Sequence, residues 1–198
     1  PIPENTQDIL TSIRSRIKES TLYHENDTFN VFLCNNKNLY TLLTPVHNRG
    51  FAVSYSVLNN IIIAYGDLEQ DLCRAYKQHH NKRSLKSVVS HEIGHELMYR
   101  HLGFWKDRRL PQWLKEGYCE VLAGDSSFPV EKGRQLMITG QSDPSWSFRY
   151  YTYRQMVDYL INESEQSINQ LAATPPNEKI VMKKTVDWLS MKRIEPVN

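Results

Sequence analysis

The sequence predicts an α+β fold, with a small and mainly antiparallel sheet in the N-terminal third followed by a mostly helical part. Two observations support this prediction. Apolar and polar residues alternate in short runs between Thr28 and Tyr65, as they do in half-buried strands. After Ser84, apolar residues recur at the three- and four-residue intervals of helices. Strands and helices that are segregated along a chain in this way are typical of α+β domains.

Size and composition predict a single domain. The chain has 198 residues, of which 40% are hydrophobic and 23% are charged, and these are ordinary values for a globular protein. A chain of this length is sufficient for one domain with its own core. We therefore expect one domain over residues 1–198, with a helix and the sheet in 1–83, the helices of the candidate site in 84–124 and further helices in 125–198.

Charge and hydropathy exclude several classes of partner. The net charge is +2 and no run of Lys and Arg is longer than two residues, so we expect no nucleic-acid partner. No stretch of about 18 apolar residues occurs, so we expect no membrane span within this chain.

The three cysteines, Cys34, Cys73 and Cys119, are widely spaced, which favours buried free thiols over a disulfide framework.

The first elements are a helix and three strands. Apolar residues recur at helical spacing over residues 4–20, where Asn5 or Thr6 can serve as the N-cap. Strand patterns cover three segments, residues 28–34, 51–57 and 61–65. We expect the first strand to be buried on at least one face, and Leu58-Asn59-Asn60 to join the other two as a hairpin. Residues 39–43 fit either a short helix or a strand.

Helices follow. Residues 67–79 predict a second helix or a long loop with helical turns. Ser84 is a good N-cap for the next helix, which Gly103 would end. Pro111 opens another helix that stops at Gly124. Four more helical patterns complete the chain, over residues 130–139, 147–163, 167–173 and 178–191.

The helix over residues 84–103 carries the pattern His91-Glu92-Ile93-Gly94-His95. Two histidines four residues apart lie on one face of a helix, where their nitrogens can bind one zinc ion. Glu92 lies between them and can act as general base on a water molecule that the metal activates. The apolar residues around the motif predict that this helix is buried, where unpartnered His and Glu side chains would be costly. A bound metal would remove that cost.

A catalytic zinc site takes three protein ligands and leaves one position open. Glu116 is the best candidate for the third ligand, because it opens the next helix and a helix–loop–helix pair can bring it back to His91 and His95. Glu120 lies one turn further on the same face. It is placed to accept a hydrogen bond from the second ring nitrogen of one of the histidines. The alternative for Glu120 is a solvated position at the surface.

A further hydrogen-bond donor to the tetrahedral oxyanion is usual in such sites. Tyr150 and Tyr151, at the start of the helix predicted over 147–163, are the nearest candidates in the sequence. Because the chain contains eleven tyrosines, a place in the core or at the surface is an open alternative for each of them.

The motif and the segment Trp113-Leu114-Lys115-Glu116-Gly117 resemble the gluzincin group of zinc metallopeptidases, which includes thermolysin-like and peptidase MA-like proteins. In that group the Glu of such a segment is the third ligand, here Glu116, 21 residues after His95. The acid one turn later corresponds to Glu120. The resemblance implies a zinc-dependent peptidase with one zinc ion and a peptide or protein substrate.

The resemblance also implies a substrate-binding strand and a compartment. In that group a strand before the motif helix forms the sheet edge that holds an extended substrate. By analogy this is the strand from Asn60 to Tyr65, with Asn60, Ile62 and Ala64 as substrate-binding residues. The group's frequent use outside the cytoplasm, with Pro1 in place of Met, favours an exported or membrane-tethered parent chain. The unpaired cysteines favour the cytoplasm.

Alternatives to a peptidase remain open. No Gly-x-Met-Glu-Asn-like segment precedes the motif helix, so aminopeptidase specificity is not expected. The main alternative is a zinc-binding interaction or regulatory domain of the same fold with little turnover, and the presence of Glu92 argues against it. A purely structural zinc site is the least favoured alternative, because it would need a fourth protein ligand, often Cys. Cys119 is the only local thiol, and we expect it to point into the packing instead.

Overall fold

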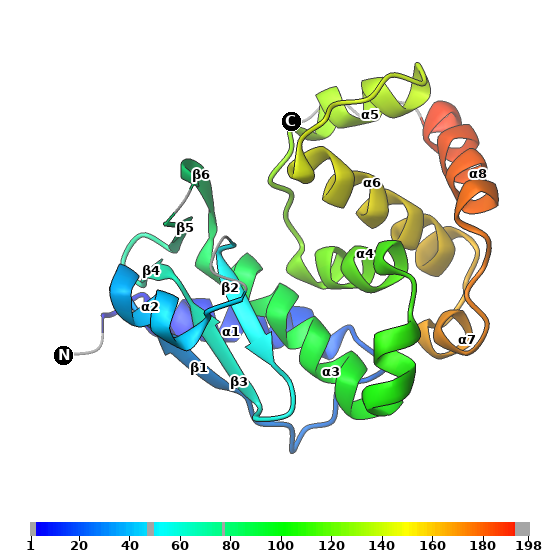
Figure 1. Cartoon of the computed structure of the whole chain (residues 1–198). Helices are drawn as coiled ribbons and strands as arrows, with labels where there is room; N and C mark the ends of the chain where they lie inside the picture. The colour runs from blue at the N-terminus through cyan, green and yellow to red at the C-terminus, as the bar shows by residue number, and fades with distance from the viewer. Residues whose placement is uncertain (1–2, 47–49, 77, 193–198) are drawn as a thin grey trace. The chain divides into compact units, whose positions relative to one another are not determined.

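A computed structural model describes residues 3–46, 50–76 and 78–192, and for residues 78–81 it describes the backbone alone. The fold class is α+β, as predicted: small sheets occupy the N-terminal part and helices the rest (Figure 1). None of the helices in the described residues combines the length and the apolar character that crossing a membrane requires.

The chain divides into two compact units. The first unit comprises Pro1–Arg109 and Cys119–Ser127, and the second comprises Leu110–Tyr118 and Phe128–Asn198. Each unit has a hydrophobic cluster of its own. The expectation of one domain over residues 1–198 stays a prediction. One boundary falls within the helix Gln112–Ala123. The residues of this helix up to Tyr118 belong to the second unit, and those from Cys119 onward belong to the first.

The first sheet belongs to the first unit. Its strands are β1 (Asn30–Leu33), β2 (Ala52–Tyr55) and β3 (Asn60–Ile63). β3 is central, with β1 parallel to it on one side and β2 antiparallel on the other. The predicted hairpin of β2 and β3 is confirmed, and Asn59 takes a positive φ in its turn. The expectation of a buried face for residues 28–34 is wrong, because Phe32 on one face of β1 is 50% exposed and Val31 on the other is 38% exposed.

The second sheet occupies the segment where a helix or a long loop was expected, residues 67–79. Its antiparallel strands are β4 (Tyr65–Asp67), β5 (Leu72–Ala75) and β6 (Gln78–Ser84). The Asp67 carboxylate accepts hydrogen bonds from the backbone N–H groups of Glu69 and Gln70, which closes the turn between β4 and β5. Strand pairing across this turn outweighs the helical spacing of the apolar residues. Residue 77 lies outside the described residues.

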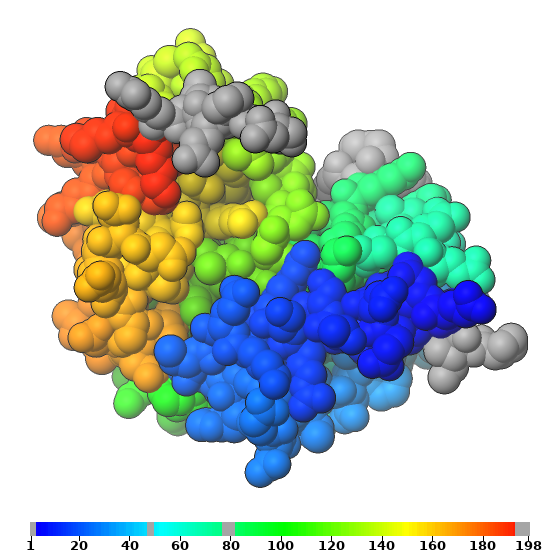
Figure 2. Space-filling model, turned by 180° about the vertical axis from the view of Figure 1, so that it is seen from behind, coloured from blue at the N-terminus to red at the C-terminus, as the bar shows by residue number. Residues whose placement is uncertain are grey.

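The first two helices also belong to the first unit. They are α1 (Thr6–Lys18) and α2 (Lys37–Leu43). The buried face of α1 consists of Ile9, Ile13 and Ile17. α1 lies at the surface of its unit (Figure 2). Asn5 precedes α1 without capping it through its side chain, which donates instead to two backbone carbonyls of the β4–β5 turn. For residues 39–43 the structure selects the helix, which Asn36 caps.

The helix that carries the motif is α3 (Leu85–Arg109). Ser84 caps it as predicted, because its hydroxyl accepts the N–H of Ser87 at 3.3 Å. Gly103 interrupts it with φ 74° and ψ 165°, after which a short helical segment continues. α4 (Gln112–Ala123) follows and ends at Gly124, whose φ is 67°.

The second unit is helical. Its further elements are α5 (Val130–Ile138), α6 (Trp146–Asp158), the π-helical turn η1 (Tyr159–Glu163), α7 (Ile168–Ala173) and α8 (Glu178–Met191). They confirm the four C-terminal helices that the sequence predicts. The core between them is largely aromatic and consists of Phe128, Met137, Phe148, Tyr151, Trp188 and Leu189.

Candidate metal centre

His91 and His95 lie side by side on α3, as their spacing predicts. Their ring centroids are 5.0 Å apart and the ring planes meet at 74°. The His91 side chain is 12% exposed. Leu97 and Met98, on the same helix, are buried. The two rings therefore lie next to each other where unpartnered polar groups would be costly.

The carboxylate of Glu120, on α4, contacts His91. Its Oε1 lies 2.9 Å from His91 Nδ1, and the Glu120 side chain is 2% exposed. Burial would raise the pKa of Glu120, but its contacts with His91 and Arg83 outweigh burial and lower the pKa to about 2. The carboxylate is therefore an anion placed to accept a hydrogen bond from Nδ1–H, so Nε2 is the nitrogen with which His91 would bind a metal. Glu120 therefore lies at contact distance from a histidine, and its predicted role as the hydrogen-bond acceptor of that histidine stays a prediction.

Cys119 lies beside the second histidine. The ligand atoms of His91, His95 and Cys119 all lie within 4.8 Å of one another. Cys119 Sγ is 3.4 Å from His95 Nδ1. α4 approaches this closely because Gly94 has no side chain, and a Cβ there would lie 3.0 Å from the sulfur. Two arrangements fit: Cys119 is a metal ligand, or it interacts with Nδ1 of His95 as Glu120 does with Nδ1 of His91.

Glu92 lies near two groups of the first unit that carry no charge at neutral pH. Burial raises the pKa of Tyr40, and the negative charge of Glu92 raises it further. Burial also raises the pKa of Cys73 to about 12, with Arg83 opposing this shift and Glu92 adding to it. The Glu92 carboxylate therefore has a neutral phenol and a neutral thiol in its surroundings.

Glu116 lies on α4 one turn before Glu120, but it belongs to the second unit. Its role as third ligand therefore stays a prediction. Within the second unit α4 packs tightly on α6, because a Cβ at Gly117 would lie only 2.4 Å from the carbonyl oxygen of Tyr153. Burial raises the pKa of Tyr153, and the charges of Glu178 and Glu116 add to the shift. The Tyr153 phenol is therefore within the electrostatic influence of the predicted ligand.

The two tyrosines selected as oxyanion donors have different positions. Tyr151 is 2% exposed and its hydroxyl donates to the carbonyl of Val130 at 3.1 Å. The prediction is wrong for Tyr151, because this hydroxyl lies in the aromatic core. Tyr150 is half-buried beside Trp146, and its role stays a prediction. Tyr153 was missed, and its position three residues after Tyr150 on one helix was the only signal for it in the sequence.

The three residues selected for substrate binding do not lie at a sheet edge. Asn60 and Ile62 are on β3, which is paired on both sides. Ala64 donates its N–H to Phe51 and accepts the N–H of Asn35. Because these backbone groups are already paired, an extended peptide cannot add to them, and the prediction of a substrate-binding edge at Asn60, Ile62 and Ala64 is wrong. Within the described residues, β2 pairs with β3 alone and is the antiparallel edge strand.

The edge strand β2 is tied to α3 beside the motif. Ser54, on β2, donates its hydroxyl to the carboxylate of Glu96. Glu96 directly follows His95 and is fully buried. This contact holds β2 against α3 at the level of the second histidine.

Comparisons with protein-family models, with curated proteins and with solved structures find no match for this chain. The candidate site therefore rests on its own geometry. That geometry includes Arg83, which no motif in the sequence indicates and which forms a buried ion pair with Glu120. The sequence carries no signal for this pair, because the two residues lie 37 positions apart.

Proposed function

We propose that this chain is a zinc-dependent peptidase. The observation that carries the proposal is the 2.9 Å contact between Glu120 and Nδ1 of His91. A histidine that binds a metal through one nitrogen usually donates from the other to a carboxylate or a carbonyl. Glu120 is almost fully buried, which excludes the alternative of a solvated surface residue.

The residues present fit a zinc ion. His91 and His95 would hold the ion through Nε2, and Glu116 would supply the third ligand, a donor set typical of catalytic zinc. Zinc, when bound, lowers the pKa of water toward neutrality and polarises the carbonyl of the substrate. The buried contacts of Glu120 and Cys119 with the Nδ1 atoms support this orientation of the two rings.

The side chains around the site would move the protons. Glu92 would take up a proton from the attacking water and deliver it to the leaving amine. A tyrosine of α6 would donate a hydrogen bond to the oxyanion, with Tyr150 and Tyr153 as the two candidates. Both tyrosines lie in the same unit as Glu116, and the charge of Glu116 acts on the Tyr153 phenol.

An extended peptide would bind along β2. The backbone groups on the outer edge of β2 have no strand partner within the described residues, so a peptide can add to this edge as a further strand. The contact of Ser54 with Glu96 supports this place, because it holds β2 beside the residue that follows His95. β2 replaces Asn60, Ile62 and Ala64 in the proposal.

Metal analysis and a peptide library test the proposal. The purified chain is expected to hold about one zinc ion, and His91→Ala to lose it. Glu92→Gln is expected to keep the metal and to lose cleavage. Absence of zinc from the wild type, or cleavage by Glu92→Gln at the wild-type rate, would overturn the proposal. Zinc binding without any cleavage across broad libraries would support the interaction or regulatory domain instead.

A second set of variants tests the third ligand. Glu116→Ala is expected to lose zinc, whereas Cys119→Ala keeps it. Glu131→Ala serves as the control, because Glu131 is an exposed glutamate of the same unit as Glu116. Loss of zinc in Cys119→Ala but not in Glu116→Ala would assign the third ligand to the thiol.

A further inference from the structure

We infer that Arg83 is a positioning residue of the metal centre, which fixes the Glu120 carboxylate so that its Oε1 faces His91 Nδ1. This inference rests on the proposed function, since orientation of His91 matters only if His91 binds a metal. Every residue that carries it belongs to the first unit.

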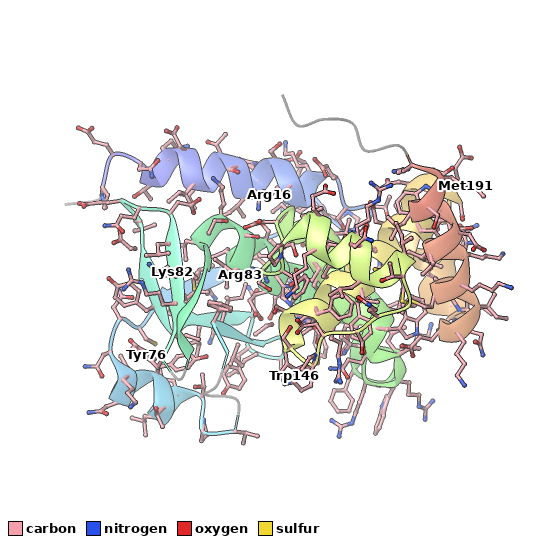
Figure 3. The ribbon with its side chains drawn as sticks, turned by 90° about the horizontal axis from the view of Figure 1, so that it is seen from above. Arg16, Tyr76, Lys82, Arg83, Trp146 and Met191 are labelled. Atoms are coloured by element: carbon pink, nitrogen blue, oxygen red, sulfur yellow. The ribbon has the colours of Figure 1, made fainter. Side chains whose placement is uncertain are left out.

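Arg83 holds Glu120 through two contacts. It is the penultimate residue of β6 and lies where the chain passes into α3 (Figure 3). Its side chain is 8% exposed. Nη1 lies 2.8 Å from Oε1 of Glu120, and Nη2 lies 3.2 Å from Oε2. Two such contacts between planar groups fix the plane of the carboxylate as well as its distance.

One carboxylate oxygen joins the arginine to the histidine. Oε1 of Glu120 is in contact with Nη1 of Arg83 and, at 2.9 Å, with Nδ1 of His91. A carboxylate held at a single point could rotate about its last bond and lose the histidine. Held at both oxygens, it presents Oε1 to Nδ1 in one direction, and the imidazole ring is oriented with it.

The guanidinium group is itself held in place. Nη2 also lies 3.4 Å from the hydroxyl of Ser87, at the start of α3, and 3.3 Å from the carbonyl of Asp125, just beyond α4. The Ser87 hydroxyl in turn donates to the carbonyl of Ala123 at 2.9 Å. Arg83 therefore connects the start of the helix that carries His91 with the end of the helix that carries Glu120.

Stability alone is a weak reason for this ion pair. The cost of removing two charges from water offsets most of their attraction, and a well-packed apolar pair often stabilises a protein as well or better. Lys82, the preceding residue on the same strand, is exposed. The contact that distinguishes the Arg83–Glu120 pair from an ordinary buried ion pair is the third one, to His91.

Zinc affinity of the full chain, measured by competition with a chromophoric chelator, tests the inference. Arg83→Lys keeps the charge but cannot form the two parallel contacts, and it is expected to weaken zinc binding roughly tenfold. Arg83→Met is expected to weaken it by up to about 100-fold. The absorption spectrum of the cobalt-substituted protein is expected to change in Arg83→Lys, because the geometry of the ligands changes.

Two control variants separate the positioning role of Arg83 from effects of net charge and of protein stability on zinc affinity. Lys82→Met removes an exposed cation one residue away and should bind zinc as the wild type does. Arg100→Met removes an arginine of the same unit that contacts Asp27 at 3.0 Å and the carbonyl of Thr28 at 2.7 Å. It should lower the free energy of unfolding without changing zinc affinity.

The outcomes distinguish this inference from the proposed function. Wild-type zinc affinity and an unchanged cobalt spectrum in Arg83→Lys would overturn the role of Arg83, even where His91→Ala loses zinc. An equal loss of affinity in Lys82→Met would also overturn it, because the effect would then be one of net charge. Zinc binding by His91→Ala at the wild-type level would instead overturn the proposed function. Should Arg83→Met fail to fold, Arg83→Lys decides the question.

Discussion

The two units bury different kinds of groups. In the first unit, Arg83, Glu120 and His91 bring ionisable side chains together almost out of contact with solvent. In the second unit, aromatic rings pack on one another, and the hydroxyl of Tyr151 donates to a backbone carbonyl. Aromatic packing contributes mainly stability, whereas a buried ion pair contributes little net stability. We therefore attribute the buried ion pair of the first unit to the positioning of His91, and the aromatic core of the second unit to its stability.

Tyr151→Ala should have one of the two largest effects on stability. It removes a ring from the core of the second unit and should lower the free energy of unfolding by about 3–5 kcal/mol, as large-to-small core substitutions do. Denaturation in urea measures this change. Tyr151→Phe keeps the ring and loses only the contact with Val130, so about 1 kcal/mol is expected. Loss of cleavage in Tyr151→Phe, with stability retained, would instead support Tyr151 as a donor to the oxyanion.

Gly94 and Gly117 lie at two places where α4 packs against another helix, and substitutions at these glycines should differ in their effect on zinc affinity. Gly117→Ala places a Cβ against the backbone of Tyr153 in the second unit, and Gly94→Ala places one against Cys119 in the first. Each should cost about 1–3 kcal/mol through overpacking. Gly94→Ala is expected to weaken zinc binding more, because it pushes the Cys119 side chain against His95, whereas Gly117→Ala would affect zinc only through the neighbouring Glu116. Equal effects of both variants on zinc affinity would break the comparison between the units.

Replacing both members of the buried ion pair should have a smaller effect on stability than removing one. Arg83→Met alone leaves the Glu120 carboxylate buried without its cation, which is expected to cost about 3–5 kcal/mol. Arg83→Met combined with Glu120→Leu should recover most of this loss while zinc binding stays weak. Thermal unfolding and chelator competition on the single and double variants measure the two quantities. A double variant that binds zinc normally would contradict the view that this polar interior serves the metal centre.

The smallest expected effect concerns the thiols. Cys34 is half-buried, whereas Cys73 and Cys119 are fully buried. Iodoacetamide should therefore modify Cys34 first in the native protein, and the other two only after unfolding. Mass spectrometry of the modified peptides checks this order. Early modification of Cys119 would show that the surroundings of His95 open more readily than the buried geometry implies.

Local patterns predicted much of the fold. The motif helix with its Ser84 cap, the break at Gly103 and the four C-terminal helices follow from spacing and from capping residues. The hairpin of β2 and β3 follows from two alternating runs and a short turn. The apolar spacing over residues 67–79 fits a helix or a long loop with helical turns, but pairing between strands decides the structure of this segment.

The candidate site, like the fold, could be predicted from the sequence only in part. The sequence by itself determined that His91 and His95 share one face of a helix with Glu92 between them, because spacing along a helix is a local property. Only the tertiary structure decided that β2 is the antiparallel edge strand, that Tyr151 belongs to a core and that Arg83 lies against Glu120. These three facts depend on contacts that segments far apart in the sequence form when the chain buries its apolar surface. The spacing of residues within one segment does not predict such contacts.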